Sequence, residues 1–336
     1  MSLSSLSFGV SIEPTWDQQY SLAFAKKAEE LDYSNIWVPD SGPVSPFCDP
    51  LVTLSAIASN TRKIKFGSAI LNFYTRNPAQ IASSFLTLSS LAKGRPVLGI
   101  GLGSSYHVSK FGVFSRKGMV EDMREAVESI RELFEGKEVS VRTDSFIIER
   151  VELSKSKTRI PVYIGASSPK GLKLAGEIAD GVILVDRIAG EIEQSTKPLT
   201  LGLSESSRSR KDLHIVNSVV ISVSRDGKKA KQAAKVTCAY LATWLDEKVS
   251  IKYGIDENKR KEIAQQIYNG NERAAAKLVD QKMLDLLTVS GTPEECVEGC
   301  KAHLDQGIDQ IAFCEPFGPE RLESLAMIAK KIIPKL

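Results

Sequence analysis

Short apolar segments alternate with helical patterns along the whole 336-residue chain. Residues 7–11 (SFGVS), 96–101 (PVLGIG) and 181–185 (GVILV) have the continuous apolar character of fully buried strands. Between such segments, apolar residues recur every three or four positions, which is typical of amphipathic helices. This alternation predicts the α/β class, in which helices cover a parallel sheet.

Eight such strands are expected, beginning near residues 7, 35, 64, 97, 161, 181, 213 and 310. Eight units favour a closed (β/α)8 TIM barrel over an open doubly wound sheet. Residues 139–152 and 245–290 exceed what simple units need, and we expect insertions there, the larger between strands seven and eight. Since no linker rich in Pro, Gly or Ser interrupts the chain, a single domain over residues 1–336 is predicted.

The charge of the chain is nearly balanced, with 44 Lys and Arg residues against 41 Asp and Glu residues. A net charge of +3 argues against nucleic acid or a membrane surface as a partner. No apolar run approaches the roughly 18 residues of a membrane span, and the first residues lack the pattern of a secretory signal. A cytoplasmic protein is therefore expected.

The five cysteines are widely scattered, which fits a reducing compartment better than a disulfide framework. Cys296 and Cys300 are spaced to share one helical face and could form half of a metal site. Val297 and Leu304 extend the same face as an apolar stripe, so packing in the core is favoured. No two of the three histidines have the spacing of a helix-borne zinc site, and no metal is predicted.

The active site of such a barrel lies at the carboxyl ends of its strands. The residues that follow the expected strands are rich in Gly, Ser and aromatic side chains. They contain few acids and bases, and no Ser/His/Asp arrangement. This composition favours a cofactor that carries the reaction.

Two glycine-containing segments are candidate cofactor contacts. Residues 165–169 (GASSP) join a buried strand to a helix, where backbone N–H groups and the helix dipole favour an anion. A simple N-cap role for Ser168 explains the segment equally well. Residues 99–103 (GIGLG) resemble a dinucleotide loop, but Ser104 stands where its third glycine would be. Close backbone packing explains those glycines better.

Several segments together resemble the luciferase-like superfamily of flavin and deazaflavin oxidoreductases. Their order and spacing cover some 310 residues, and the likeness extends to the methylenetetrahydromethanopterin reductase branch, which uses coenzyme F420. The segments are 8–10 (FGV), 64–67 (IKFG), 72–78 (NFYTRNP), 94–95 (GR), 98–101 (LGIG), 160–166 (IPVYIGA), 174–181 (LAGEIADG), 290–294 (SGTPE) and 316–319 (PFGP).

The resemblance implies a (β/α)8 barrel, usually a homodimer, that holds a deazaflavin ring at the strand ends. It implies a non-prolyl cis peptide at Ala69-Ile70 behind the ring, with Asn72 nearby. By the same likeness, Gly165, Ala166, Ser167 and Ser168 hold the coenzyme phosphate, and Asp40 and Ser41 lie near the ring or its side chain. A hydride then passes between ring C5 and a small-molecule substrate such as a reduced pterin.

The chain departs from the reductase branch at three positions. That branch tends to carry Glu where this chain has Ser11, Asp where it has Ser104, and His where it has Ser41. Glu13 and Glu315 follow other strands and are candidate catalytic replacements for those acids. Both are equally well explained as solvated loop carboxylates.

The leading hypothesis is a coenzyme F420-dependent oxidoreductase that acts on a methylene-tetrahydropterin or a related small molecule. The alternative is an FMN-dependent monooxygenase of the same fold, which would consume oxygen. A third reading is a flavin-binding relic without activity.

Overall fold

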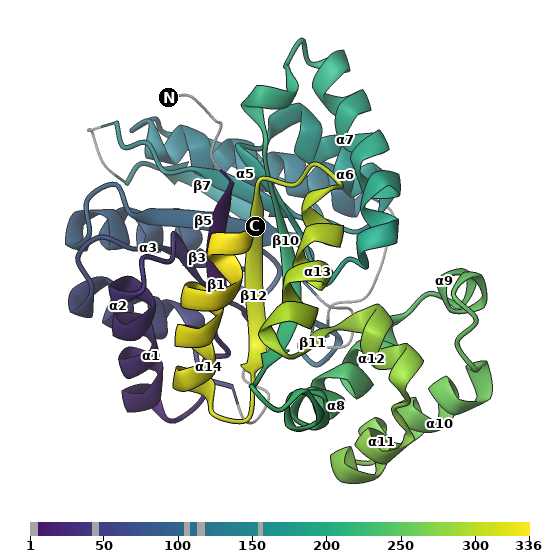
Figure 1. Cartoon of the computed structure of the whole chain (residues 1–336). Coiled ribbons are helices and arrows are strands. Elements are labelled where there is room, and N and C mark those ends of the chain that lie inside the picture. The colour runs from purple at the N-terminus through teal and green to yellow at the C-terminus, as the bar shows by residue number, and fades with distance from the viewer. Residues whose placement is uncertain (1–5, 42–46, 104–107, 113–117, 154–156) are drawn as a thin grey trace. The chain divides into compact units, whose positions relative to one another are not determined.

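The computed structural model describes residues 6–41, 47–103, 108–112, 118–153 and 157–336. The chain forms two compact units. The first comprises residues 1–185 and 193–216, and the second comprises residues 186–192 and 217–336. Strands alternate with helices in each of them (Figure 1).

Parallel strands form the centre of the first unit, in the order β1–β2–β3–β5–β8–β9. Short β4 pairs with β5 beside them, so that Asn72 lies opposite Gly101. The strands are β1 (Ser7–Ser11), β2 (Asn35–Val38), β3 (Lys65–Ser68), β4 (Leu71–Asn72), β5 (Pro96–Gly101), β8 (Val162–Gly165) and β9 (Gly181–Leu184).

Two helices of this unit have the same N-terminal capping arrangement. Asp49 and Asn77 each accept a hydrogen bond at a helix N-terminus, and a proline follows each of them at the first helical position. Figure 1 shows the first three helices lying outside the strands. The helices are α1 (Gln18–Glu30), α2 (Pro50–Asn60), α3 (Pro78–Leu91), α5 (Met119–Phe134), α6 (Pro169–Ile178) and α7 (Ile192–Glu205).

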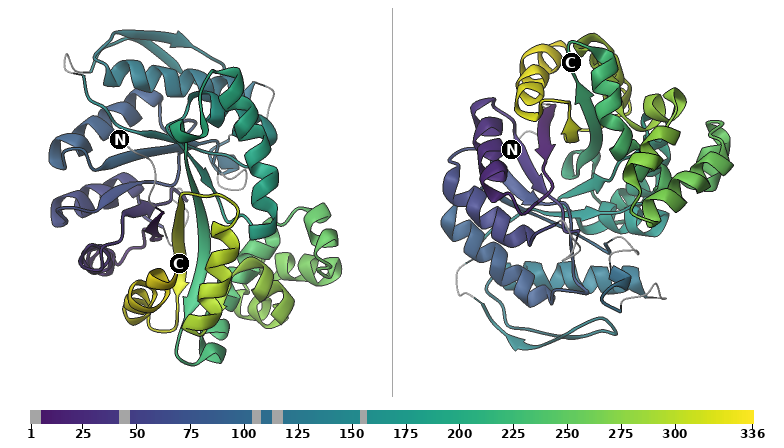
Figure 2. Two further views of the ribbon diagram at one scale, coloured as in Figure 1. Left: turned by 45° about the horizontal axis from the view of Figure 1, so that its top comes forward. Right: turned by 90° about the horizontal axis from the view of Figure 1, so that it is seen from below.

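A separate antiparallel hairpin, β6 (Val139–Arg142) and β7 (Ile147–Val151), lies beside α5 (Figure 2). The Asn77 side-chain amide donates to the carbonyl of Ile147 at 2.9 Å, and the Phe73 and Phe146 rings meet edge to face. The hairpin therefore supports the segment that follows β4.

The second unit contains the long strand β10 (His214–Val223) from Asn217 onward, and nine of the ten residues of this strand are buried. Ile221 of β10 lies opposite Val289 of β11, a three-residue strand that is not among the eight expected ones. The other elements are β11 (Val289–Gly291), β12 (Gln310–Phe317), α8 (Gly227–Trp244), α9 (Glu247–Lys252), α10 (Glu257–Tyr268), α11 (Glu272–Leu278), α12 (Gln281–Leu287), α13 (Pro293–Leu304) and α14 (Arg321–Met327).

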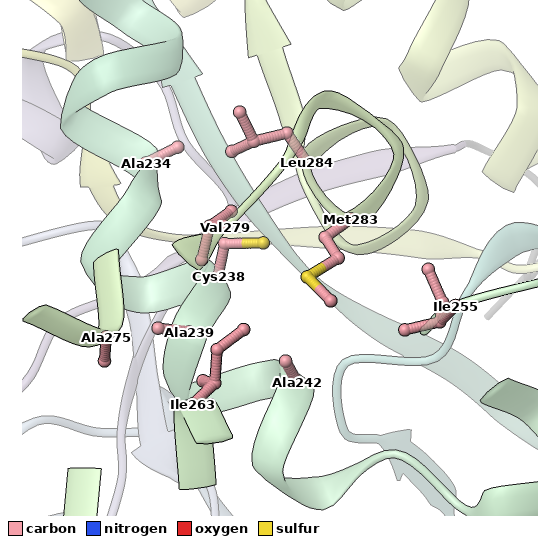
Figure 3. Packing of buried hydrophobic residues seen from close by; sticks show 10 residues of the cluster. All are labelled: Ala234, Cys238, Ala239, Ala242, Ile255, Ile263, Ala275, Val279, Met283 and Leu284. Atoms are coloured by element: carbon pink, nitrogen blue, oxygen red, sulfur yellow. The ribbon is translucent and has the colours of Figure 1, made fainter. Parts of the chain in front are cut away.

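Helices α8, α10, α11 and α12 share a hydrophobic cluster of their own (Figure 3). Cys238 of α8 and Met283 of α12 are fully buried in it, together with Ile263 of α10. Its ten buried residues are Ala234, Cys238, Ala239, Ala242, Ile255, Ile263, Ala275, Val279, Met283 and Leu284.

The parallel strands and their helices define a (β/α)8 barrel, as the alternation predicts. Each of the eight expected strands is present within one residue of its expected start. The single domain over 1–336, with insertions at 139–152 and 245–290, stays a prediction. In the described part of the chain, no helix is long and apolar enough to span a membrane.

Candidate active site

Asp40 follows β2 and is tied to a neighbouring loop by an arginine. Its side chain is only 2% exposed, and its Oδ2 lies 3.5 Å from Nε of Arg76. The same guanidinium donates through Nη2 to Asp49, the N-cap of α2, at 2.7 Å. Burial lowers the pKa of Arg76, but Asp49 and Asp40 outweigh it and the pKa is raised. Arg76 therefore carries a charge that holds both carboxylates in place, and Ser41 follows Asp40 as a half-buried residue.

The peptide bond between Ala69 and Ile70 is cis, as the family resemblance predicts. Ile70 stands between β3 and β4 and packs against glycines of two other strands. A Cβ atom added to Gly101 would lie 2.5 Å from Cδ1 of Ile70, and one added to Gly165 would lie 2.8 Å from its Cγ2. The structure thus brings two predicted cofactor contacts, Ile70 and Gly165, together across the ends of β5 and β8.

Gly99 of β5 serves close backbone packing, as predicted. A Cβ on Gly99 would lie 2.0 Å from the carbonyl oxygen of Ser68. The buried Ser68 hydroxyl also donates to the Gly99 carbonyl at 2.7 Å and accepts from its N–H at 3.1 Å. No room for a dinucleotide phosphate is left at this position.

Asn72 closes a turn with its own side chain. Its Oδ1 accepts from the N–H of Thr75 at 3.0 Å and from the Thr75 hydroxyl at 2.9 Å. The residue is buried, with 6% of its surface exposed. Asn72 therefore shapes the loop that leads to Arg76, and a direct cofactor contact remains a prediction.

The predicted phosphate segment leads from β8 into α6. Ser168 is the N-cap, and its hydroxyl accepts from the N–H of Gly171 at 3.2 Å. Ser167 and Ser168 are exposed, and Ala166 is half-buried. The segment consists of small residues at an open helix N-terminus, which suits an anion.

The two predicted catalytic carboxylates lie in different units. Glu13 follows β1 in the first unit and is half-buried, two residues beyond Ser11. Glu315 lies in β12 of the second unit, where its Oε2 is 3.0 Å from Nη2 of Arg321 and its side chain is 15% exposed. It is therefore ion-paired rather than freely solvated. Ser104 lies outside the described residues.

One carboxylate at a strand end is not among the site residues named from the sequence. Asp186 lies two residues beyond β9 with a positive φ of 49°, an uncommon conformation for a residue other than glycine. Its Oδ1 accepts from the Ser218 hydroxyl at 2.9 Å, and its N–H donates to the same hydroxyl at 2.7 Å. Burial raises the pKa of the Asp186 carboxyl to about 6. The sequence signal was only its position directly after a strand.

A second polar group of this unit surrounds Asn217 of β10, which is fully buried. Its Nδ2 donates to the carbonyl of Arg187 at 3.2 Å and lies 3.1 Å from Nδ1 of His303. Burial lowers the pKa of His303 to about 4, so the ring is neutral and accepts the amide hydrogen. These bonds fix the start of the loop after β9.

The predicted core role of the cysteine pair agrees with the structure. Cys296 and Cys300 of α13 are both fully buried. Burial raises the pKa of the Cys296 thiol to about 12, and it raises the pKa of Cys300 as well. Neither thiol is therefore a ready thiolate ligand.

The fold defines a (β/α)8-barrel protein in which glycines and small side chains lie at the ends of β5 and β8. The model of the luciferase-like monooxygenase family matches residues 5–310, and the chain belongs to this family.

Two curated relatives are named 5,10-methylenetetrahydromethanopterin reductase. The one from Archaeoglobus fulgidus is 31% identical, with 98% of this chain and 100% of the relative covered. The one from Methanolobus tindarius is 30% identical, again with 98% of this chain and 100% of the relative covered. The solved coenzyme F420-dependent tetrahydromethanopterin reductase of Methanopyrus kandleri superposes with a TM-score of 0.92 at 27% identity, covering 98% of this chain and 99% of that one.

Proposed function

We propose that this protein is a coenzyme F420-dependent oxidoreductase that transfers a hydride between deazaflavin C5 and a methylene-tetrahydropterin. The observation that carries this proposal is the likeness, over essentially the full length of both chains, to methylenetetrahydromethanopterin reductases. An enzyme of one-carbon metabolism in the cytoplasm fits this activity.

The strand ends of the first unit suit a flat ring with a phosphate-bearing side chain. Gly101 and Gly165 let the Ile70 side chain pack against the ends of β5 and β8, because a Cβ at either glycine would collide with it. Ala69, Ile70 and Asn72 would lie on one side of the ring, and Asp40 with Ser41 near its edge. Gly165, Ala166, Ser167 and Ser168 would hold the phosphate at the N-terminus of α6.

When bound, coenzyme F420 supplies a two-electron hydride donor or acceptor at C5. The residues of this chain orient the ring and the substrate and keep water from the reacting atoms. Arg76 contributes by fixing Asp40 between β2 and α2. Glu13 and Glu315 are the proposed catalytic carboxylates, and their role would be to donate or accept a proton.

The second candidate is an FMN-dependent monooxygenase, which is favoured by the description of the matching family. The two candidates differ in chemistry at one ring atom. Deazaflavin has carbon where FMN has N5, so it does not support the usual oxygen chemistry of flavins. Oxygen uptake during turnover therefore separates them.

Equilibrium binding of coenzyme F420 and FMN to the purified chain, followed by fluorescence, tests the proposal. We expect selective binding of coenzyme F420, followed by its oxidation when methylenetetrahydromethanopterin is added to the reduced form. Selective FMN binding with oxygen uptake would favour the monooxygenase. Binding of either cofactor without turnover of any reduced pterin or alcohol would favour the inactive relic.

We also propose a homodimer formed through α2 and α3. These neighbouring helices contain no charged residue, although Val52 is 67% exposed and Leu91 is 54% exposed. Helices that face water normally carry charges on their outer side. A second copy of the same uncharged surface is the occupant that fits, and the molar mass in solution tests this.

A further inference from the structure

A groove of about 350 Å³ lies between α6 and α7, two helices of the first unit that are labelled in Figure 1. Lysines and apolar side chains line it, and no carboxylate is among its lining residues in the described structure. The lining residues are Pro169, Lys170 and Lys173 of α6 and Lys197, Pro198 and Leu201 of α7.

Close packing of α6 against α7 fixes the walls of this groove. A Cβ atom added to Gly176 of α6 would collide with the carbonyl oxygen of Leu199. One added to Gly202 of α7 would collide with the carbonyl oxygen of Lys173. The two backbones are therefore in direct contact at two points, and the groove is formed before any ligand binds. A preformed site spares a ligand the cost of ordering its walls.

Lys173 is already occupied by carboxylates of the chain itself. Its Nζ lies 2.5 Å from Glu177 and 2.6 Å from Glu205. Hydrogen bonds to these two carboxylates raise the pKa of Lys173. Its charge is therefore neutralised within the protein, and it contributes mainly to the shape of the groove.

The other two lysines are available to a ligand. Lys197 is 71% exposed and lies 3.4 Å from Glu193, which is 73% exposed, and water strongly weakens such a pair. Lys170 is exposed, and no hydrogen bond or ion pair joins its side chain to another residue of the described structure. Lys170 and Lys197 thus present two ammonium groups beside the apolar surface of the groove.

The groove begins where the proposed phosphate segment ends. Ser168 is the N-cap of α6, and Pro169 is both the first residue of that helix and part of the groove. Coenzyme F420 continues beyond its phosphate into a chain of linked glutamate units, whereas FMN ends at its phosphate. Each glutamate unit combines methylene groups with a carboxylate, which matches an apolar surface flanked by ammonium groups.

We propose that the groove between α6 and α7 binds the acidic tail of coenzyme F420, with Lys170 and Lys197 pairing with its carboxylates. This inference rests on the proposed function, because it places the coenzyme phosphate at residues 165–168. The methylene groups of the tail pack against Pro198 and Leu201, of which Leu201 is 49% exposed. The groove favours coenzyme F420 over FMN through a part of the molecule that takes no part in hydride transfer.

The test compares two forms of the coenzyme, one with several glutamate units and one with none. Their Kd values are measured by fluorescence titration at low ionic strength, where exposed charges act most strongly. We expect wild type to bind the tailed form about 3- to 20-fold more tightly, since each exposed ion pair contributes up to about fivefold. In Lys170→Gln/Lys197→Gln this ratio should fall close to one, with little change in the Kd of the tailless form.

Two further variants serve as controls. Lys63→Gln/Lys65→Gln removes the same charge from exposed lysines at the beginning of β3, the opposite end of a strand from the proposed site, and should keep the wild-type ratio. Lys170→Arg/Lys197→Arg retains both charges and should keep most of the preference. At about 1 M salt, where charges are screened beyond roughly 3 Å, the wild-type ratio should fall towards that of the glutamine variant.

The outcomes separate this inference from the proposed function. Equal binding of the two forms by wild type overturns the tail site and leaves the proposed function standing. The tail site is also overturned if Lys170→Gln/Lys197→Gln keeps the wild-type ratio, or if Lys63→Gln/Lys65→Gln loses it to the same extent. If wild type binds neither form, the proposed function fails and the tail site fails with it.

Discussion

The strand ends of the first unit and the loop after β9 in the second unit are built by different means. Around Ile70, shape comes from close packing at glycines, against the Ser68 carbonyl at Gly99 and against the Ile70 side chain at Gly101 and Gly165. Around Asp186 and Asn217, it comes from side-chain hydrogen bonds between a few buried polar groups. The packing around Ile70 tolerates no added atom, whereas the hydrogen bonds around Asp186 and Asn217 depend on the protonation states of the side chains.

This difference determines what each region reveals in the sequence. A backbone atom that would lie 2.0 Å from an added Cβ requires glycine at that position. The glycine in the sequence therefore indicates the close contact. A raised pKa depends on the surroundings of the side chain. The sequence does not distinguish a buried aspartate from one exposed to water. Variants that add atoms should therefore damage the first region, and changes of pH should act on the second.

Gly99→Ala tests the first region with the largest expected effect. The new methyl group would collide with the carbonyl oxygen of Ser68, which belongs to a paired strand and cannot move aside. We expect the free energy of unfolding to fall by about 3 kcal/mol or more. Denaturant titration measures it.

Gly112→Ala is the matched control, because nothing lies within 4 Å of its added Cβ and its φ is +74°. It should cost about 1 kcal/mol, from backbone conformation alone. An equal loss in both variants would mean that the contact with Ser68 is not the cause.

His303 tests the second region through the pH dependence of stability. Its pKa is lowered by burial to about 4, below the roughly 6.5 of an unfolded histidine. The neutral ring therefore contributes stability that is present above pH 6.5 and lost as the pH falls towards 4. We expect about 3 kcal/mol of such loss in wild type. In His303→Gln this part of the pH dependence should disappear, and an unchanged curve would contradict the assignment.

Ser167→Asp has the smallest expected effect of these variants and tests cofactor binding in the first unit. The exposed side chain leaves folding intact, but its carboxylate would repel an anion at the N-terminus of α6. We expect the Kd for coenzyme F420 to rise at least tenfold, or about 1.4 kcal/mol. Ser167→Asn has the same size without the charge and should bind nearly as wild type does. Equal binding by all three proteins would move the phosphate site elsewhere.

The fold could be predicted in detail because its signals are local. Continuous apolar runs located β1, β2 and β9, and the glycines of 99–103 indicated close packing rather than a nucleotide loop. Strand β11 was missed because three residues, Val289–Gly291, are too few to form a pattern. The cis peptide at Ala69-Ile70 came from family resemblance, since neither residue type requires it.

The site could be predicted only in part. Gly165 and Ile70 meet as expected, but Glu315 is ion-paired to Arg321, a partner six residues away that sequence spacing alone did not identify. Asp186 was given no role because Ser218, its hydrogen-bonding partner, lies 32 residues further along the chain. Pairings of that kind exist only after folding.

The hydrophobic cluster shared by α8 and α10–α12 has a consequence for motion. Ile263, Val279 and Met283 are buried chiefly among these helices, so their burial can be lost as one step. Segments held in this way exchange their amide hydrogens together and at a lower free energy than the strands of the core. Residues 257–287 should thus form a cooperative opening unit, which the cell's proteases would reach before the barrel itself unfolds.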